Sequence, residues 1–307
     1  MLPFVLSDLP TDDPEKQQVS GRSGNGSGLR ESIRDINDRL WDFRQRVADF
    51  GILGVLHADK TTEESEKLYL KGIYAERTAY SLIHQKGREY FAQAAALGHG
   101  PSRFHVRFAE FCDATIPYKG LCNDDSVKNW LEYEAERGFN EALYIIGKLC
   151  QCDIRSETAR LVKYWVRDDG YARGILQIAA DRGHIPATFE LGCWFETFSY
   201  EYDIPDAAIQ AVKWVTKAAE TGFMPAQAKL GEFYTKGDLA PKDPKRAFHW
   251  YQLAATQGDV FSQYTVAECY RDGIGVEQNL DKAIEWYRKS KSYNKSRWAL
   301  EELGVEV

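Results

Sequence analysis

Large apolar, small and polar positions recur at one fixed interval in the last third of the chain. Tryptophan stands at positions 214, 250 and 286, which are 36 residues apart. The same interval separates Ala211, Ala247 and Ala283; Gly222 and Gly258; Gln227 and Gln263; Glu232 and Glu268; Tyr234 and Tyr270; and Gly237 and Gly273. A repeat of this length predicts a stack of helix pairs, because one pair cannot bury its apolar face without neighbours.

The pattern extends toward the N-terminus with less regular spacing. Its recurring glycines stand at positions 98, 138, 183, 222 and 258, separated by 40, 45, 39 and 36 residues. We expect a helix to end at each of them, because glycine enters the left-handed conformation without steric cost. Asp243 and Pro244 predict the start of a helix, with the carboxylate as N-cap and proline at the first position. Trp250 and Tyr251 are predicted to fill the space between helices.

Several of these residues resemble a known family. Gly273-Ile274-Gly275-Val276, Asp281-Lys282-Ala283 and Trp286-Tyr287 are similar to the Sel-one-like repeat, a relative of the tetratricopeptide repeat. The similarity is clear over about 175–287, weaker over 90–147, and limited to half a unit at 68–74. It implies an all-α, right-handed superhelical solenoid of antiparallel helix pairs. It also implies a role in protein–protein contact, normally without catalytic residues.

The sequence divides into three regions. Residues 1–28 have the composition of a flexible tail or linker; their glycine-rich stretch lacks the Lys-Ser/Thr of a phosphate-binding loop. Residues 29–60 carry one apolar helical face, which predicts a helix that caps the array; a coiled-coil or partner-binding helix is the alternative. Residues 61–307 form the predicted repeat array. The apolar residues of the capping helix are Ile33, Ile36, Leu40, Phe43, Val47 and Phe50.

Composition narrows the possible partners and compartment. The net charge of −7 and the pI near 5.5 argue against nucleic acid, whose phosphates require a basic surface. No apolar run approaches the roughly 18 residues of a membrane span, and the first residues lack the positive charge of a secretory signal. The six cysteines are scattered, as expected of buried thiols in a reducing compartment. We therefore expect a cytoplasmic protein without membrane insertion.

The sequence shows no arrangement typical of catalysis. Cys150 and Cys152 lack a second cysteine pair or a spaced histidine pair to complete a zinc site. His99 and His184 share the position just after a recurring glycine, which indicates a structural role in the repeat. We predict no catalytic residue, no cofactor and no metal, and hence a protein that is not an enzyme.

Polar residues at equivalent repeat positions are the candidates for binding a protein partner. In related solenoids the first helix of each pair lines the concave face, so such residues should form rows along it. One predicted row contains Thr188, Gln227 and Gln263; the next contains Lys148, Glu232 and Glu268; the third contains Glu196, Thr235 and Arg271.

Two functions fit this reading. The first is a scaffold or adaptor that holds a protein partner, such as a secretion or signalling component, in the concave groove. The alternative is a bacterial immunity protein that binds and neutralises a secreted toxin, as some bacterial members of the family do. The locally basic segment from Lys289 to Arg297 is a further docking hypothesis.

Overall fold

All regular secondary structure in the described part of the chain is α-helical. A computed structural model describes residues 62–78, 85–115, 126–151, 168–198 and 206–305, which contain thirteen helices. The first seven are α2 (Glu63–Thr78), α3 (Gln85–Ala96), α4 (Gly100–Thr115), α5 (Ser126–Glu136), α6 (Asn140–Gln151), α7 (Asp169–Asp181) and α8 (Ile185–Phe198). The remaining six are α9 (Ala207–Glu220), α10 (Met224–Lys236), α11 (Pro244–Thr256), α12 (Val260–Asp272), α13 (Leu280–Lys289) and α14 (Asn294–Glu302).

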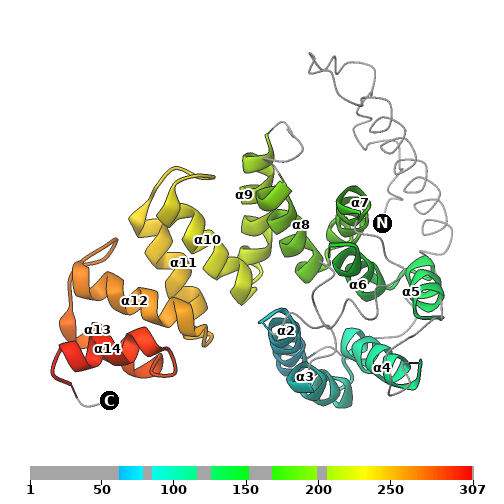
Figure 1. The fold of residues 1–307 in the computed structure, drawn as a ribbon, viewed down its shortest axis with the longest axis horizontal. Helices are drawn as coiled ribbons and strands as arrows, with labels where there is room; N and C mark the ends of the chain where they lie inside the picture. The colour runs from blue at the N-terminus through cyan, green and yellow to red at the C-terminus, as the bar shows by residue number, and fades with distance from the viewer. Residues whose placement is uncertain (1–61, 79–84, 116–125, 152–167, 199–205, 306–307) are drawn as a thin grey trace.

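Successive helices pack against each other in chain order, so the array grows by one antiparallel pair at a time (Figure 1). The pairs are α2/α3, α4/α5, α6/α7, α8/α9, α10/α11 and α12/α13, and α14 follows them. Below, the first helix of each pair, together with α14, is an A helix, and the second is a B helix. The predicted all-α, right-handed superhelical solenoid of antiparallel helix pairs is confirmed.

The recurring glycines end B helices, as predicted. Gly98, Gly138, Gly183, Gly222 and Gly258 all have positive φ angles, between 83° and 101°. Other residues enter this region only with steric strain, so glycine sets where the chain turns into the next A helix. The predicted start at Asp243 and Pro244 is also confirmed. Asp243 accepts hydrogen bonds from the amides of Lys245 and Arg246, and Pro244 opens α11.

A second set of glycines lets the two helices of a pair approach closely. A Cβ atom added at Gly147, Gly192 or Gly231 would lie within 3.0 Å of the B-helix side chain that packs on it. Those side chains are Leu176, Val215 and Tyr251 respectively. Each of these three A helices therefore has room for a large apolar group from its own B helix.

The core follows the array from end to end. One contiguous apolar cluster runs from α2 to α10, and a second runs from α11 to α14. Tyr234 packs against both clusters and so links them. Tyr251 is buried, as predicted, and Trp250 is half-buried against the first cluster.

Some predictions concern residues outside the described ranges. The tail at 1–28 and the capping helix at 29–60 lie there, as do Cys122, Cys152 and the side chain of Cys112. The cysteines whose side chains are described are free thiols: Cys150 and Cys269 are buried, and Cys193 is half-buried. Burial raises the pKa of Cys193 to about 11, which leaves its thiol protonated at neutral pH.

The close contact between α6 and α7 can be tested by Gly147→Ala. The added methyl group would press on Leu176, so the free energy of unfolding in urea should fall by about 1–3 kcal/mol. Leu176→Ala alone leaves a cavity and should cost about 2–5 kcal/mol. In the Gly147→Ala background, Leu176→Ala should cost at least about 1 kcal/mol less, because it also relieves the clash. Equal costs in both backgrounds would rule out this steric coupling.

Candidate partner-binding surface

Helix α2 contacts units that lie far from it in the sequence. The hydroxyl of Tyr69 lies 3.1 Å from Nε2 of His184, which is 115 residues away. The hydroxyl of Tyr74 donates a 3.0 Å hydrogen bond to Asp259, which is 185 residues away. Units of a solenoid ordinarily contact only their immediate neighbours. Here the A helix of the first pair lies against the starts of later A helices.

The residues that α2 contacts are helix caps. His99, His184 and Asp259 each follow a recurring glycine and directly precede an A helix. Each accepts a hydrogen bond from the backbone amide three residues further on, at 3.2, 3.2 and 2.8 Å respectively. The structural role predicted for His99 and His184 is thus confirmed, because each satisfies an amide that the helix itself leaves unpaired.

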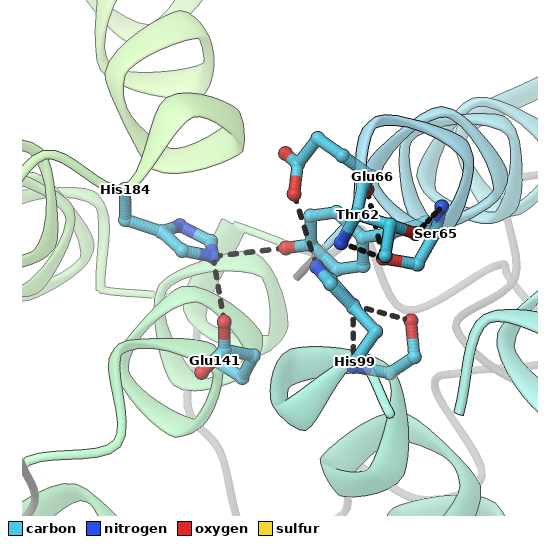
Figure 2. Close-up of polar contacts among 8 residues, drawn as sticks. Thr62, Ser65, Glu66, His99, Glu141 and His184 are labelled. Atoms are coloured by element: carbon cyan, nitrogen blue, oxygen red, sulfur yellow. Dashed lines mark hydrogen bonds and ion pairs between the residues drawn. The ribbon is translucent and has the colours of Figure 1, made fainter. Parts of the chain in front are cut away.

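The opposite atoms of the same three caps bind α2. Figure 2 shows the contacts made by His99 and His184. The pairs are His99 Nε2 with Glu66 Oε2 at 3.0 Å, His184 Nε2 with the Tyr69 hydroxyl at 3.1 Å, and Asp259 Oδ1 with the Tyr74 hydroxyl at 3.0 Å. Each of these three residues therefore caps its own helix and also binds α2.

His184 also connects α2 to α6. Its Nδ1 accepts the amide of Ala187, so the neutral ring carries its proton on Nε2. That nitrogen lies 3.5 Å from Oε1 of Glu141 and beside the Tyr69 hydroxyl (Figure 2). Burial opposes ionisation of Glu141, but the hydrogen bond from His184 and its electrostatic attraction to the carboxylate outweigh burial and lower the pKa of this carboxyl. Burial and the nearby carboxylates, with Glu141 first, raise the pKa of Tyr69 well above its usual value.

A second cluster lies further along α2. Glu190 of α8 is buried between the guanidinium of Arg77 and the ammonium of Lys148, whose nitrogen is 3.1 Å away. The guanidinium also lies 4.6 Å from the ring centre of Phe189, within range of a cation–π contact. Burial opposes ionisation of Glu190, but the two cations outweigh it and lower the pKa of its carboxyl. Three units are joined at this point by one carboxylate.

Glu76 and His105 form a buried pair without a hydrogen bond between them. Oε2 of Glu76 lies 3.9 Å from Nδ1 of His105, beyond hydrogen-bond length. Burial raises the pKa of Glu76 well above its usual value and lowers the pKa of His105 to about 3. The His105 ring stacks on Phe91 with centroids 4.1 Å apart. Because the His105 ring is neutral near pH 7, this contact is not an ion pair.

We call the side of the A helices that meets α2 the inner face. In the first four units α2 covers this face, so Lys148 is engaged within the chain. The first predicted row is also structural. Thr188 and Gln227 are buried, and the amide groups of Gln227 and Gln263 donate to carbonyls eight residues earlier, those of Ala219 and Ala255. These bonds satisfy carbonyls at the ends of B helices.

The second and third rows lie on the inner face of α10 and α12, where they are partly exposed. Glu232 pairs with Lys229 at 3.1 Å and with Lys236, and Lys229 also pairs with Glu196 of α8 at 2.8 Å. Glu196 and Glu232 therefore belong to one continuous line of alternating charge across two units. Thr235 lies beside it and donates to the carbonyl of Gly231.

Glu268 and Arg271 continue the surface on α12. Their side chains pair at 2.8 Å, and Arg271 also pairs with Asp272 at 2.7 Å. Glu268 accepts a hydrogen bond from the hydroxyl of Tyr287. Burial together with this carboxylate raises the pKa of Tyr287. The structure thus links Glu196 to Glu232 through Lys229 and pairs Glu268 with Arg271; all four side chains are partly exposed, whereas Thr188 and Gln227 lie in the interior.

Sequence reasoning missed the role of α2. Tyr69, Tyr74 and Arg77 lie in the least regular copy, and their partners stand more than 100 residues away in the sequence. The available signal was the shared position of His99, His184 and Asp259 after the recurring glycines. It indicated a cap but not what the other side of the cap binds.

Two absences apply to the described residues. Within those ranges, no group of three or more His, Cys, Asp or Glu side chains could hold a metal ion. None of the described helices is both long and apolar enough to cross a membrane.

The fold and the charged inner surface define an α/α solenoid of the peptide- and protein-binding type. More particularly, the chain belongs to the Sel1 repeat family. The model of that family matches residues 67–99, 186–223, 225–259 and 260–292. Between residues 100 and 185, α4 to α7 continue the array where the family pattern is not matched. Comparison with curated proteins finds no match.

Solved structures similar to this chain include three bacterial proteins. A Sel1 repeat protein from Oxalobacter formigenes is 33% identical over 41% of this chain and 95% of its own, with a TM-score of 0.38. A protective antigen of uropathogenic Escherichia coli with an SLR fold is 20% identical over 85% of this chain, with a TM-score of 0.52. The present chain spans 50% of that antigen. An immunity protein from Pseudomonas aeruginosa is 15% identical over 80% and 84% of the two chains, with a TM-score of 0.40.

The pairing of the buried Glu190 carboxylate with Arg77 and Lys148 predicts a large loss of stability on Arg77→Met. Loss of the guanidinium leaves a buried carboxylate with Lys148 alone, so the free energy of unfolding should fall by about 1–3 kcal/mol. Lys67→Met on the same helix is the matched control. It breaks an exposed pair with Glu63 and should change stability by no more than about 0.5 kcal/mol. Equal effects of the two substitutions in urea unfolding would show that the Arg77–Glu190 pair adds nothing to the free energy of unfolding.

The raised pKa of Glu76 predicts a pH-dependent gain in stability from Glu76→Gln. Its folded pKa lies above the unfolded value of 4.5, so its contribution is full below that pH and is lost as pH rises toward the folded value. Glutamine does not titrate and keeps the shape of the protonated acid. Near pH 8 the variant should melt at a higher temperature than wild type, and its free energy of unfolding should be larger by about 1.4 kcal/mol per unit of pKa elevation avoided. Near pH 4 the two should be alike; the same gain at both values would refute a titrating Glu76.

Proposed function

We propose that this protein is a non-enzymatic cytoplasmic scaffold that binds a protein partner on the inner face of α10 and α12, together with Glu196 near the C-terminal end of α8. The observation that carries the proposal is a difference between equivalent positions along the array. Glu190 is buried against Arg77 of α2, whereas Lys229 stands at the same repeat position on α10 and remains partly open to solvent, as does Glu232 beside it. The uncovered part of the inner face therefore offers a surface of the kind that α2 already occupies.

The charges on this surface are held in place before any partner arrives. Lys229 links α8 to α10 through Glu196 and Glu232, and Arg271 is fixed between Glu268 and Asp272. Fixed alternating charges favour selectivity, because a partner must match their order and a mismatched one leaves charges unpaired. This supports binding of one specific partner segment over general adhesion.

Helix α2 supports the same proposal from within the molecule. It lies on the inner face and contributes Tyr69 to a histidine cap and Arg77 to a carboxylate. The partner would use the same chemistry on α10 and α12, with cations facing Glu232 and Glu268. A helical segment that bears arginine or lysine one or two turns from an aromatic residue suits this surface.

Affinity purification of the tagged full-length chain from its own cells would identify the partner. Several partners in substoichiometric amounts would indicate an adaptor. One stoichiometric partner, encoded by a neighbouring gene and toxic when expressed alone, would indicate an immunity protein. Recovery of no protein under conditions that keep the chain folded would contradict the proposed function.

The double substitution Glu232→Ala and Glu268→Ala should weaken binding of the purified partner by about tenfold or more, as expected for loss of central charged contacts. Glu232→Ala alone should change stability by no more than about 0.5 kcal/mol. Glu268→Ala should cost about 1 kcal/mol, because Tyr287 loses its hydrogen-bond acceptor. Glu285→Ala, which changes an exposed carboxylate on the B helix α13, is the control. Calorimetric titration giving wild-type affinity for the double variant would exclude this surface.

A further inference from the structure

The A helices are joined by a recurring contact between rings. The fifth residue of an A helix packs on the residue that directly precedes the next A helix. Four junctions have this arrangement: Phe104 with Phe139, Tyr144 with His184, Phe189 with Phe223, and Tyr264 with Tyr293, with ring centroids 5.8, 5.3, 5.5 and 5.2 Å apart. Two junctions differ. Between α2 and α4 the two positions hold Lys67 and His99, and between α10 and α12 they hold Ala228 and Asp259, which binds Tyr74 of α2 instead.

Trp298 is the fifth residue of α14 and therefore occupies the same position. It is 66% exposed, the largest value among the exposed large apolar side chains of the described chain. Within that part of the chain, no ring lies against it as Tyr293 lies against Tyr264. Phe261, which is 52% exposed and close to Tyr293, extends the apolar surface toward α12. Every other ring at this position of an A helix packs against a second ring, whereas Trp298 of α14 has no such partner in the described chain.

The charge around Trp298 is unlike that of the rest of the chain. Residues 288–297 contain five basic side chains and no acidic one, in a protein whose net charge is −7. These side chains are Arg288, Lys289, Lys291, Lys295 and Arg297; all are exposed, and none pairs with a carboxylate in the described structure. Glu301 and Glu302 lie one turn beyond Trp298 on the other side. Cations and carboxylates therefore flank the ring on opposite sides.

We propose that the exposed end formed by Trp298, Lys291, Lys295 and Arg297 binds an acidic segment of a partner protein that carries an aromatic residue. The aromatic ring packs on Trp298 as rings do at the four internal junctions, and carboxylates before or after it pair with the basic side chains. This inference rests on the proposed function and adds a second contact, with a defined chemistry, beyond the inner face of α10 and α12.

The arrangement favours a peptide over a polyanion. A nucleic acid strand or an anionic membrane carries negative charge on both sides of the ring and would meet Glu301 and Glu302 as well as Lys295. A peptide can place its carboxylates on the basic side alone. The excess negative charge of the remaining chain also repels a long polyanion.

A phage-displayed library of random dodecapeptides, panned on the full-length chain, provides the test. We expect enrichment of peptides in which an aromatic residue adjoins at least two Asp or Glu residues. A synthetic enriched peptide should bind Trp298→Ala at least about tenfold more weakly than wild type, as expected of a central aromatic anchor. Binding should also weaken with Lys291→Glu and Lys295→Glu, and with added salt. Leu280→Ala is the matched control, since Leu280 is likewise exposed on the last units, and it should leave affinity unchanged.

Because Trp298 is exposed, its replacement should preserve the circular dichroism spectrum and melting temperature, which are measured first. Enriched peptides without acidic or aromatic residues, or wild-type affinity for Trp298→Ala, would overturn the inference. So would a single-stranded oligonucleotide, or a second copy of the chain in sedimentation, that binds more tightly than the peptides and requires Trp298. Peptides lost with Glu232→Ala and Glu268→Ala but retained by Trp298→Ala would uphold the proposed function while refuting this additional contact.

Discussion

The contact between α2 and the capped starts of α4, α8 and α12 determines how the rest of this solenoid is organised. In a simple repeat array each unit stabilises only its neighbours, and the ends can unfold separately. Here Glu66, Tyr69 and Tyr74 of one helix bind caps in three different units. Since the same cap atoms hold the starts of their own helices, disruption of α2 affects several units at once. The first four units consequently behave as a closed body, and the later units extend from it.

The inner face of that body is filled with polar groups, and their burial is tolerated for two different reasons. Glu190 keeps its charge because Arg77 and Lys148 both approach it. At Glu76 burial outweighs the attraction of Arg88 and Lys148 and raises the pKa of the carboxyl, while burial lowers the pKa of His105 to about 3, so that ring stays neutral. Buried ionisable groups contribute little net stability compared with apolar ones, but they require partners at well-defined positions. The inner face of the first four units is thereby specific for α2. Equivalent positions on α10 and α12 also carry charged side chains, but no helix packs on them.

The sequence predicts what local physics determines. Glycine at 222 or 258 and the Asp243-Pro244 pair set helix limits through backbone conformation alone, so these limits are correct. The first predicted row contains side chains with a local alternative to the surface: Gln227 looks like a surface residue by type, yet it is buried and donates a hydrogen bond to a carbonyl eight residues earlier. The position of α2 depends on superhelical curvature accumulated over several units. No single repeat encodes that curvature, so the meeting of Tyr74 with Asp259 is not readable from spacing.

The long reach of α2 also sets an order of events during synthesis. Asp259 is made 185 residues after Tyr74, and ribosomes add about 5–20 residues each second, so α2 waits on the order of 10–40 s for its last partner. During that interval Tyr69 can already meet His184, while Tyr74 has no acceptor. Translation therefore lets α2 bind the first four units before the later ones join them. Arg77 can meet Glu190 in this period as well, so Tyr74 is the last of these α2 residues to find its partner.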